Sequence, residues 1–443
     1  MTGNSPPLLL QRRFWPMWVA LSFGTFADNV LRQSLLIGIP YGVIAAPNFG
    51  RPDNAVPLIG ALLPLAIMLF SPLSGQLAVK YETSMMFRRT KFVEIILMLI
   101  TATAFLTGAG SLAILMLFAM GAQSAFFSPV RTSAMPKYLA ADELVRGNGL
   151  CNAGLYSFIL IGYMVGGSLI VREDGRALVG IILVAASTTG WLAALRTLRA
   201  GANDPDLRID LNWIAQIARM VGFVRSSRGV APPLLGVAVF FLLSTCVTVA
   251  TPLYARDSLN ADALVATVLN GLFAIGAGLG AIFSAGLARG KSGLGYSAAS
   301  VGAAGVFSLL IAVLTPIAAA PPGETLSAHD LVTTAPGLML VILFIATSAL
   351  MGVYIAPLQA AVQRRAPPTV RARIMAAGVF ANALFALPGS LSIFAITNSD
   401  ADPASAFFAV AFAMLAIAAV MLHRRRTLAD GLYDEVLNQK KSD

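Results

Sequence analysis

Long apolar segments recur almost without interruption along this chain, and they constrain its fold more than any other feature. A helix rises about 1.5 Å per residue, so roughly 20 apolar residues cross the hydrocarbon core of a bilayer. Segments of that length predict an all-α membrane protein, because a helix satisfies its backbone hydrogen bonds within itself. We expect twelve transmembrane helices, at residues 15–46, 56–79, 91–108, 111–133, 148–171, 177–199, 232–256, 263–288, 295–320, 336–363, 373–396 and 403–423.

Charged residues are scarce and unevenly placed. They make up 12% of the chain, about half the share that is typical of a soluble domain. The net charge of +10 does not indicate nucleic-acid binding, because the basic residues lie in short clusters between apolar segments. With a cytoplasmic N-terminus, the inner segments hold 25 basic residues and the outer segments 4, while Arg32 and Arg131 lie within spans, which accounts for all 31. This asymmetry follows the positive-inside rule and predicts that both termini are cytoplasmic.

A long connection at residues 200–231 divides the twelve spans into two sets of six. Within it, apolar residues recur with a helical period over 211–224, which predicts an amphipathic helix along the membrane surface. The two sets also repeat, since Pro129 ends the fourth span and Pro357 lies at the matching place in the tenth. Repeated six-span halves are the arrangement expected of the major facilitator superfamily. We expect an N-terminal half at 1–199, the linker at 200–231, a C-terminal half at 232–423 and a cytoplasmic tail at 424–443.

The first span carries polar residues near its middle, where a membrane helix is usually apolar. Asp28 lies near mid-depth, and a carboxylate there is costly even on lenient insertion scales. It is the one acidic residue that we place deep within a span. Arg32 follows at i+4 on the same helical face, so the two side chains can partly neutralise each other. Two interpretations remain open: an internal ion pair that fixes helix packing, or a polar lining of a substrate path.

Catalytic and metal-binding motifs are not recognisable in the chain. The two histidines, His329 and His423, lie in a loop and at a membrane edge. No histidine pair is spaced for a metal, no nucleophile elbow is present, and the Gly-Lys-Ser at 290–292 lacks the upstream glycine of an ATP-binding loop. Cys151 and Cys246 fall in apolar segments, where we expect small buried residues and no disulfide. We therefore expect neither an enzyme nor a bound cofactor.

The connection between spans two and three resembles the cytoplasmic signature of the major facilitator superfamily. That signature combines a glycine, an acidic residue and a basic pair; here Gly75, Arg88 and Arg89 match it, but a valine occupies the acidic position. The resemblance implies a cytoplasmic gate in which a carboxylate caps helices and pairs with arginines. Glu82 or Glu94 is the candidate to replace the acidic residue. The predicted gating residues are Gly75, Glu82, Arg88 and Arg89.

Three blocks resemble the bacterial lysophospholipid transporter family. Residues 26–29, Phe-Ala-Asp-Asn, are similar to that family's Phe-Gly-Asp-Asn in the first span. Residues 127–131 and 142–150 are similar to its Ser-Pro-x-Lys segment and the Leu-Val-x-x-Asn-Gly-Leu that follows, and residues 356–363 resemble its Val-Pro-Leu-Asn-Ala…Gln. The resemblance implies a secondary transporter that moves lysophospholipids from the outer to the cytoplasmic leaflet of the bacterial inner membrane by alternating access.

The chain departs from this family in the seventh span, where the family carries an arginine and this sequence offers only threonines as polar candidates. Arg32 is our candidate to replace the missing charge. A lysophospholipid phosphate needs a cationic donor, which Arg131 or Arg32 supplies, and its ammonium needs a carboxylate, which Asp28 supplies. The predicted substrate-binding residues are Asp28, Asn29, Arg32, Gln33, Arg131, Asn152, Thr248, Gln359 and Asn382.

An alternative function stays open on the same fold: a proton-coupled exporter of amphipathic drugs or siderophore-like compounds. In either case we expect a monomer whose partners are an amphipathic small molecule and the membrane lipids, with a proton or sodium ion as a candidate for coupling. Nucleic acid is not an expected partner.

Overall fold

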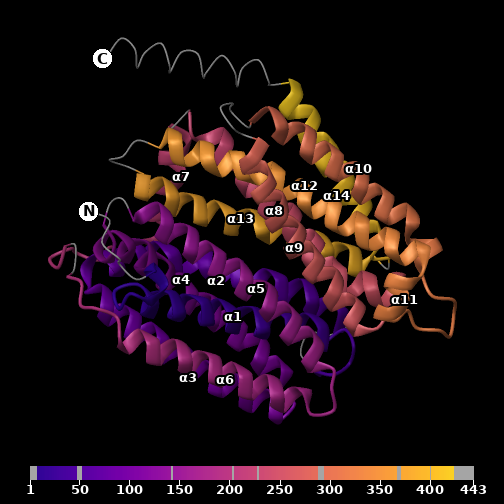
Figure 1. Ribbon diagram of the computed structural model, residues 1–443, viewed down its shortest axis with the longest axis horizontal. Helices are drawn as coiled ribbons and strands as arrows, with labels where there is room; N and C mark the ends of the chain where they lie inside the picture. Colours follow the sequence, from indigo (N-terminus) through magenta and orange to yellow (C-terminus); the bar gives the residue numbers. More distant parts are fainter. Residues whose placement is uncertain are drawn as a thin grey trace.

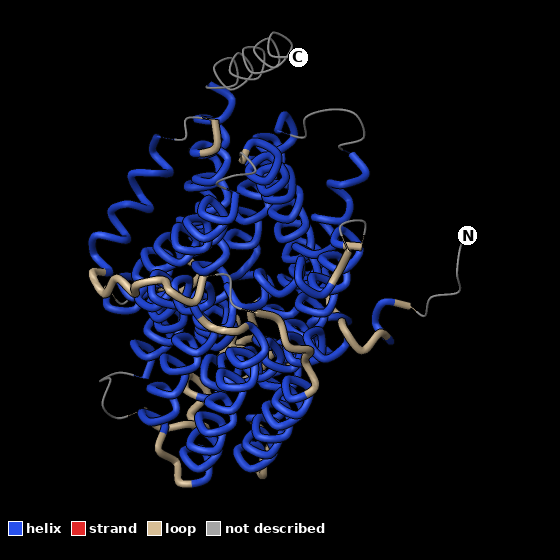
Figure 2. Tube along the Cα trace, turned by 90° about the vertical axis from the view of Figure 1, so that its left-hand side faces the viewer, coloured by secondary structure: helices blue, strands red, loops and turns tan. Residues whose placement is uncertain are grey.

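The computed structural model shows a chain that is almost entirely helical (Figure 1). The structure describes residues 7–46, 52–140, 143–201, 204–226, 229–287, 294–366, 371–399 and 401–423. Figure 2 draws these residues as helices joined by loops, without a strand among them.

Two groups of long helices make up the molecule, and α7 (Trp213–Ser226) lies between them in the sequence. The short helix η1 (Leu8–Leu10) precedes the N-terminal group. That group comprises α1 (Trp15–Gly38), α2 (Pro52–Lys80), α3 (Thr83–Leu106), α4 (Gly110–Tyr138), α5 (Leu144–Ile170) and α6 (Gly175–Leu195). The C-terminal group comprises α8 (Ala231–Leu253), its π-helical extension η3 (Tyr254–Ser258), α9 (Ala263–Leu287), α10 (Leu294–Ala318), the short α11 (Ala328–Thr333), α12 (Ala335–Arg365), α13 (Arg371–Asn398) and α14 (Ser405–His423).

Ten of the helices that the structure describes are long and apolar enough to cross a membrane. The other two long helices are α1 and α3, which carry charged residues in their interiors. α1 packs against α5 and α6, whereas α3 packs against α4 and α6 and keeps one face exposed. Twelve long helices therefore correspond to the twelve expected spans, and the prediction of an all-α membrane protein is confirmed.

Two predicted boundaries differ from the structure by more than the others. The first span was expected to reach residue 46, but α1 ends at Gly38 and a turn follows, in which Gly42 has a φ of 75°. The third span was expected to begin at residue 91, but α3 begins at Thr83. Lys91, which we counted in the inner connection, therefore lies inside the helix, three residues before Glu94.

The two helix groups lie side by side, the N-terminal group below and the C-terminal group above in Figure 1. They touch mainly where α2 packs on α13 and α5 packs on α9. We use the name linker end for the end of the bundle that holds α7 and the α2–α3 turn, and distal end for the opposite end, which holds η3 and α11 (left and right in Figure 1).

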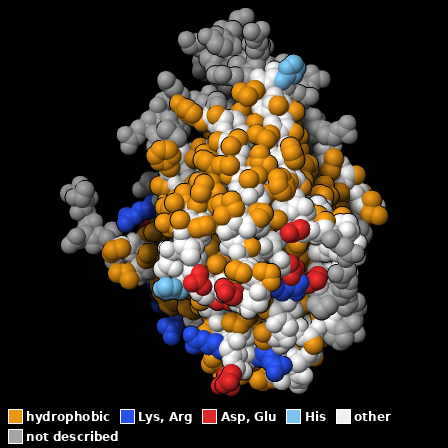
Figure 3. Space-filling view, turned by 90° about the vertical axis from the view of Figure 1, so that its right-hand side faces the viewer, with side chains coloured by type: hydrophobic (Ala, Val, Ile, Leu, Met, Phe, Trp, Pro, Cys, Tyr) orange, Lys and Arg blue, Asp and Glu red, His pale blue; other side chains and the backbone are white. Residues whose placement is uncertain are grey.

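The outer surface of the bundle is apolar, as a lipid environment requires. Large hydrophobic side chains are exposed along the outward faces of α3, α6, α10 and α14, among them Phe92, Ile181, Val313 and Phe412. Figure 3, which views the molecule from the distal end, shows hydrophobic side chains over much of the surface and charged ones gathered in its lower half. Exposed apolar surface on this scale is typical of a protein embedded in a bilayer.

Candidate functional site

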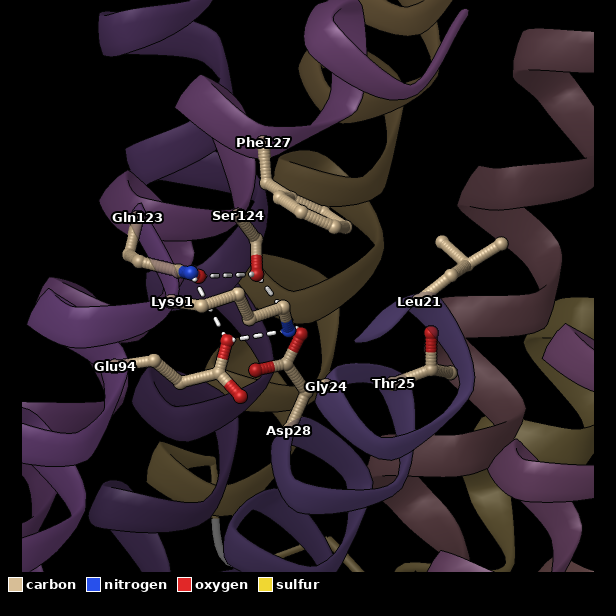
Figure 4. Close-up of a pocket in the computed structure, with 9 residues that line it drawn as sticks. All are labelled: Leu21, Gly24, Thr25, Asp28, Lys91, Glu94, Gln123, Ser124 and Phe127. Carbon is tan, nitrogen blue, oxygen red and sulfur yellow. Dashed lines mark hydrogen bonds and ion pairs between the residues drawn. The ribbon is translucent and has the colours of Figure 1, made fainter. Parts of the chain in front are cut away.

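A cavity of about 120 Å³ lies within the N-terminal group, where α1, α3 and α4 meet (Figure 4). Its volume exceeds that of a single water molecule several times. Charged and amide side chains from all three helices face it. The lining residues are Leu21, Gly24, Thr25, Asp28, Lys91, Glu94, Gln123, Ser124 and Phe127.

A buried ion pair from α3 forms one wall of this cavity. Lys91 Nζ lies 2.6 Å from Glu94 Oε2, and each side chain is only 1% exposed. The two residues are three positions apart, so consecutive turns of α3 bring them onto one face. Gln123 on α4 donates from Nε2 to the same Glu94 oxygen at 3.0 Å and to the Thr90 carbonyl at 3.1 Å. The Lys91 ammonium also lies 4.5 Å from the ring centroid of Phe127, at a distance that suits a cation–π contact.

Asp28 approaches the same cavity from α1. Ser124 Oγ on α4 donates to Asp28 Oδ2 at 2.8 Å. The other oxygen, Asp28 Oδ1, is buried and accepts no hydrogen bond within the described residues, and the same holds for Glu94 Oε1. Two carboxylates thus share the cavity with one ammonium, so the fully ionised site carries a net charge of −1. Buried acceptors without donors are costly, and the site is therefore suited to take up a proton or a cationic group.

Gly24 explains how the Lys91 ammonium fits against α1. A Cβ atom added at residue 24 would overlap Lys91 Nζ and would also touch Glu94 Oε2 at 3.4 Å. A glycine is therefore required for the ion pair to lie directly on the backbone of α1, one turn before Asp28.

Arg32 and Asp28 turn to different neighbours. Arg32 Nη1 donates to the Tyr163 hydroxyl on α5 at 3.2 Å, whereas Asp28 is bound to Ser124 on α4. No ion pair joins Asp28 to Arg32, although the structure describes both residues. One of the two interpretations left open above was an internal ion pair between these two side chains. The structure shows that this pair is not formed. The Arg32 Nε is buried and lacks a partner within the described part of the chain.

The remaining predicted substrate-binding residues of α1 face other surroundings. Asn29 donates from Nδ2 to the Thr25 carbonyl at 2.7 Å, and its Cβ lies beside Gly162 of α5. Gln33 is fully buried, and neither of its amide atoms has a hydrogen-bond partner in the described residues. Both residues thus lie close to the Asp28 and Arg32 positions without bonding to them.

Predicted site residues outside α1 are dispersed. Thr248 on α8 is 7% exposed and donates to the Ser244 carbonyl of its own helix at 2.9 Å. Asn382 on α13 has a buried Oδ1 without a partner in the described residues. Asn152 and Gln359 are exposed. Arg131 belongs to α4, but its side chain lies outside the described residues.

The predicted gating residues lie at the linker end. Glu82 precedes α3 and accepts a hydrogen bond from the Ser84 hydroxyl at 2.5 Å. Arg88 donates to the Thr197 carbonyl at 3.3 Å, and Arg89 is exposed. Glu94, the other candidate carboxylate for the gate, lies instead in the buried pair with Lys91.

The C-terminal part of α2 also binds the linker, through the Val79 carbonyl, which accepts from the Asp204 backbone nitrogen at 3.1 Å, and through one amide side chain. A Cβ added at Gly75 would meet no atom within 4 Å, so that glycine has open space around it. Its neighbour Gln76 donates from Nε2 to the Asp210 carbonyl at 3.0 Å and accepts from the Asp210 backbone nitrogen at 2.8 Å. The connection from this part of α2 to the linker is thus made by hydrogen bonds at Gln76 and Val79.

Sequence reasoning missed most of the site, since Asp28 is the one predicted substrate-binding residue among those that line the cavity. It placed one acidic residue deep in a span, whereas Glu94 is as deeply buried as any charged residue described. Gln123 and Ser124 were also overlooked. A signal was present: Lys91 and Glu94 have opposite charges at i, i+3 and stand directly before a long apolar run, where an unpaired charge would be costly.

Comparisons with known proteins place this architecture in a family. A family model of the Major Facilitator Superfamily matches residues 21–390. The lysophospholipid transporter LplT of Cronobacter sakazakii is 28% identical over 197 residues, which cover 44% of this chain and 46% of that protein. LplT of Salmonella typhi is 27% identical over 176 residues, 40% of each chain. The matches thus span less than half of these relatives.

Solved structures agree on the fold. A POT family transporter in complex with a thioalcohol-conjugated peptide superposes with a TM-score of 0.68 at 11% identity, covering 94% of this chain and 96% of that one. The peptide transporter POT in complex with sulfate gives a TM-score of 0.66 at 14% identity, with coverage of 93% and 94%. At these identities the likeness concerns the fold alone. The family match and the multi-pass helical fold together show that this chain belongs to the Major Facilitator Superfamily of membrane transporters.

Proposed function

We propose that this secondary transporter moves lysophospholipids from the outer to the cytoplasmic leaflet of a bacterial inner membrane by alternating access. The observation that carries the proposal is the arrangement of unpartnered polar atoms on and around α1. Asp28 Oδ1 and Glu94 Oε1 lack donors, and Arg32 Nε lacks an acceptor within the described residues. A zwitterionic head group offers both kinds of missing partner in one molecule.

The spacing of these groups suits such a head group. Asp28 and Arg32 are four residues apart, which is about 6 Å along a helix. An ethanolamine ammonium is separated from its phosphate by two carbon atoms, so the ammonium can reach the carboxylates while the phosphate approaches Arg32. Charge-assisted hydrogen bonds of this kind are about twice as strong as neutral ones. We assign Arg131 as a second phosphate ligand because of the sequence block that contains it. The Phe127 ring offers apolar surface beside the cavity.

The curated relatives support the same substrate class, since both are named lysophospholipid transporters. Their similarity covers less than half of each chain, so the substrate remains a proposal about this protein.

One observation favours the second candidate, a proton-coupled exporter of amphipathic drugs or siderophore-like compounds. Two carboxylates that share one ammonium can hold a proton between them, and a proton bound there would be linked to the conformation of the surrounding helices. In that case the cavity would exchange a proton for a cationic substrate, and the direction of transport would follow the pH gradient.

A transport assay in proteoliposomes distinguishes the two functions. One set of vesicles receives radiolabelled lysophosphatidylethanolamine without an ion gradient, and a second set receives a fluorescent cationic dye under a pH gradient. We expect lysolipid translocation well above that of protein-free vesicles, and dye movement no faster than in those vesicles. Arg172→Ala, at an exposed turn between α5 and α6, is the matched control and should behave as the wild type. Gradient-driven dye movement without lysolipid translocation would reject the proposal in favour of the exporter.

A further inference from the structure

Lys91 is the one basic residue among the described residues that line the α1–α3–α4 cavity (Figure 4). Its ammonium lies 2.6 Å from a single carboxylate oxygen, Glu94 Oε2. Glu94 Oε1 and Asp28 Oδ1 are buried and accept no hydrogen bond within the described part of the chain. Two carboxylates and one ammonium give the ionised cavity a net charge of −1. The cavity therefore offers more negative charge than one lysine can neutralise.

Within this pair, Glu94 is the fixed partner and Lys91 is the adjustable one. Gln123 of α4 donates to Glu94 Oε2 at 3.0 Å and to the Thr90 carbonyl at 3.1 Å, so a second helix holds the carboxylate in place. Lysine instead carries its ammonium on a flexible four-carbon chain. Since Lys91 and Glu94 lie three residues apart on α3, the two charges can separate without the movement of any helix.

A second resting position for the ammonium lies beside the first. The ring centroid of Phe127 is 4.5 Å from Lys91 Nζ, within the range of a cation–π contact, which strengthens when water is excluded. Gly24 leaves the adjacent face of α1 without a side chain, because a Cβ atom there would overlap Lys91 Nζ. The ammonium can thus leave Glu94 and still be stabilised by the Phe127 ring.

The cavity has room for a second ammonium group beside Lys91. Its volume of about 120 Å³ is several times that of one water molecule, which suits an ammonium group on a short carbon chain. Such a group can donate to the two unpartnered oxygens, Asp28 Oδ1 and Glu94 Oε1. With it, two positive charges face two negative ones, and the buried site becomes neutral. A cationic ligand is therefore favoured, provided that Lys91 yields its hold on Glu94.

We propose that Lys91 is an exchangeable counter-cation, which binds Glu94 while the cavity is free of cargo and gives way toward the Phe127 ring when an ammonium group of the cargo enters. Competition with Lys91 weakens the binding of cationic groups and favours their release, since a ligand must displace the resident ammonium. The inference rests on the proposed function only in placing a cationic group of the cargo in this cavity. It holds for whichever molecule carries that group.

Affinity for a small ammonium ion measures this competition directly. Isothermal titration calorimetry on the purified full chain in detergent uses ethylammonium chloride at constant ionic strength, with ethanol as an uncharged match of similar size. We expect Lys91→Gln to bind ethylammonium about tenfold more tightly than the wild type, because a neutral amide competes less for the Glu94 carboxylate. Glu94→Gln removes one of the two carboxylates and should bind ethylammonium about tenfold more weakly. Neither change should be seen with ethanol.

Further variants separate competition from a general loosening of the site. Lys80→Gln removes a lysine at the end of α2, outside the cavity, and should bind ethylammonium as the wild type does. Lys91→Met leaves no donor at residue 91, so ethylammonium should raise its melting temperature more than that of the wild type. The proposal would be overturned by an equal or weaker affinity in folded Lys91→Gln, by no greater stabilisation of Lys91→Met, or by the same gain in Lys80→Gln. Lysolipid translocation does not enter this measurement, so a failure of the proposed function is a separate result.

Discussion

Removing one partner of the Lys91–Glu94 pair should destabilise the protein far more than removing both. In Lys91→Met, the Glu94 carboxylate keeps Gln123 as a donor to Oε2 and has none for Oε1. Since Glu94 is only 1% exposed, its charge is left buried and poorly compensated, at a cost of about 3–5 kcal/mol. Glu94→Gln should cost less, about 1–3 kcal/mol, because the amide oxygen still accepts from Lys91.

The double variant Lys91→Met with Glu94→Gln contains no buried charge from α3. Replacing a buried ion pair with neutral residues of similar volume is often close to neutral for stability, so the double variant should recover most of the loss seen in Lys91→Met. Thermal unfolding of the purified protein in detergent, followed by tryptophan fluorescence, measures all four members of the cycle. The expected order of melting temperatures places Lys91→Met lowest and the double variant near the wild type.

Transport activity, measured on the same variants, shows whether the Lys91–Glu94 pair contributes to transport as well as to stability. The double variant should fold and yet transport more slowly than the wild type, because the cavity keeps the Asp28 charge but loses the Glu94 carboxylate as a second partner for a cationic group. Additive destabilisation, with the double variant worse than Lys91→Met, would refute the buried pair as we describe it. A stable double variant with full transport would show that the pair only packs α3 against α4.

Three further outcomes follow from single contacts. Arg32→Leu should reduce transport of phosphate-bearing substrates at least tenfold at unchanged expression, whereas equal losses for a neutral analogue would indicate a packing role. Gly24→Ala should displace the flexible end of Lys91, so that uptake falls while the melting temperature changes by only a few degrees; normal uptake would contradict the fit between α1 and the ammonium. Finally, a hydrogen bond from the Ala140 backbone and the Arg13 guanidinium lower the pKa of Glu143 below its usual 4.5. The ionised Glu143 carboxylate therefore stabilises the folded state fully above about pH 4.5, and this contribution is lost as the pH falls through the lowered pKa. The melting temperatures of wild type and Glu143→Gln should accordingly differ at pH 7 and converge in acid.

The membrane fold could be predicted from the sequence because its signal is local. An apolar run of the right length predicts a helix without reference to its neighbours, and the span expected at 177–199 is found as α6 at Gly175–Leu195. The amphipathic period over 211–224 likewise corresponds to α7 at Trp213–Ser226. A predicted boundary was wrong where charged residues lie inside a helix, as at the start of α3. The reason is that a hydropathy reading ends a span at the first charged residues.

The candidate site could not be predicted in the same way, because it is formed by contacts between helices that no local sequence pattern contains. Glu94 is tolerated inside the bundle because Lys91 and Gln123 meet it there, and Gln123 comes from another helix. Asp28 and Arg32 share a helical face, which left an ion pair open as one interpretation, but each side chain instead bonds to another helix, Asp28 to Ser124 and Arg32 to Tyr163. Spacing along one helix therefore selected Asp28 and Arg32 as candidates and left their partners undetermined.

The central claim is that the Asp28 carboxylate takes part in binding the transported molecule, and Asp28→Asn tests it most directly. An asparagine keeps the volume of the side chain and an acceptor for Ser124, but it removes the negative charge. The measurement is the initial rate at which labelled lysophosphatidylethanolamine crosses the membrane of proteoliposomes that contain equal amounts of folded wild type or variant. We predict that the variant falls to the rate of protein-free vesicles. A folded Asp28→Asn protein that transports at the wild-type rate would contradict the account.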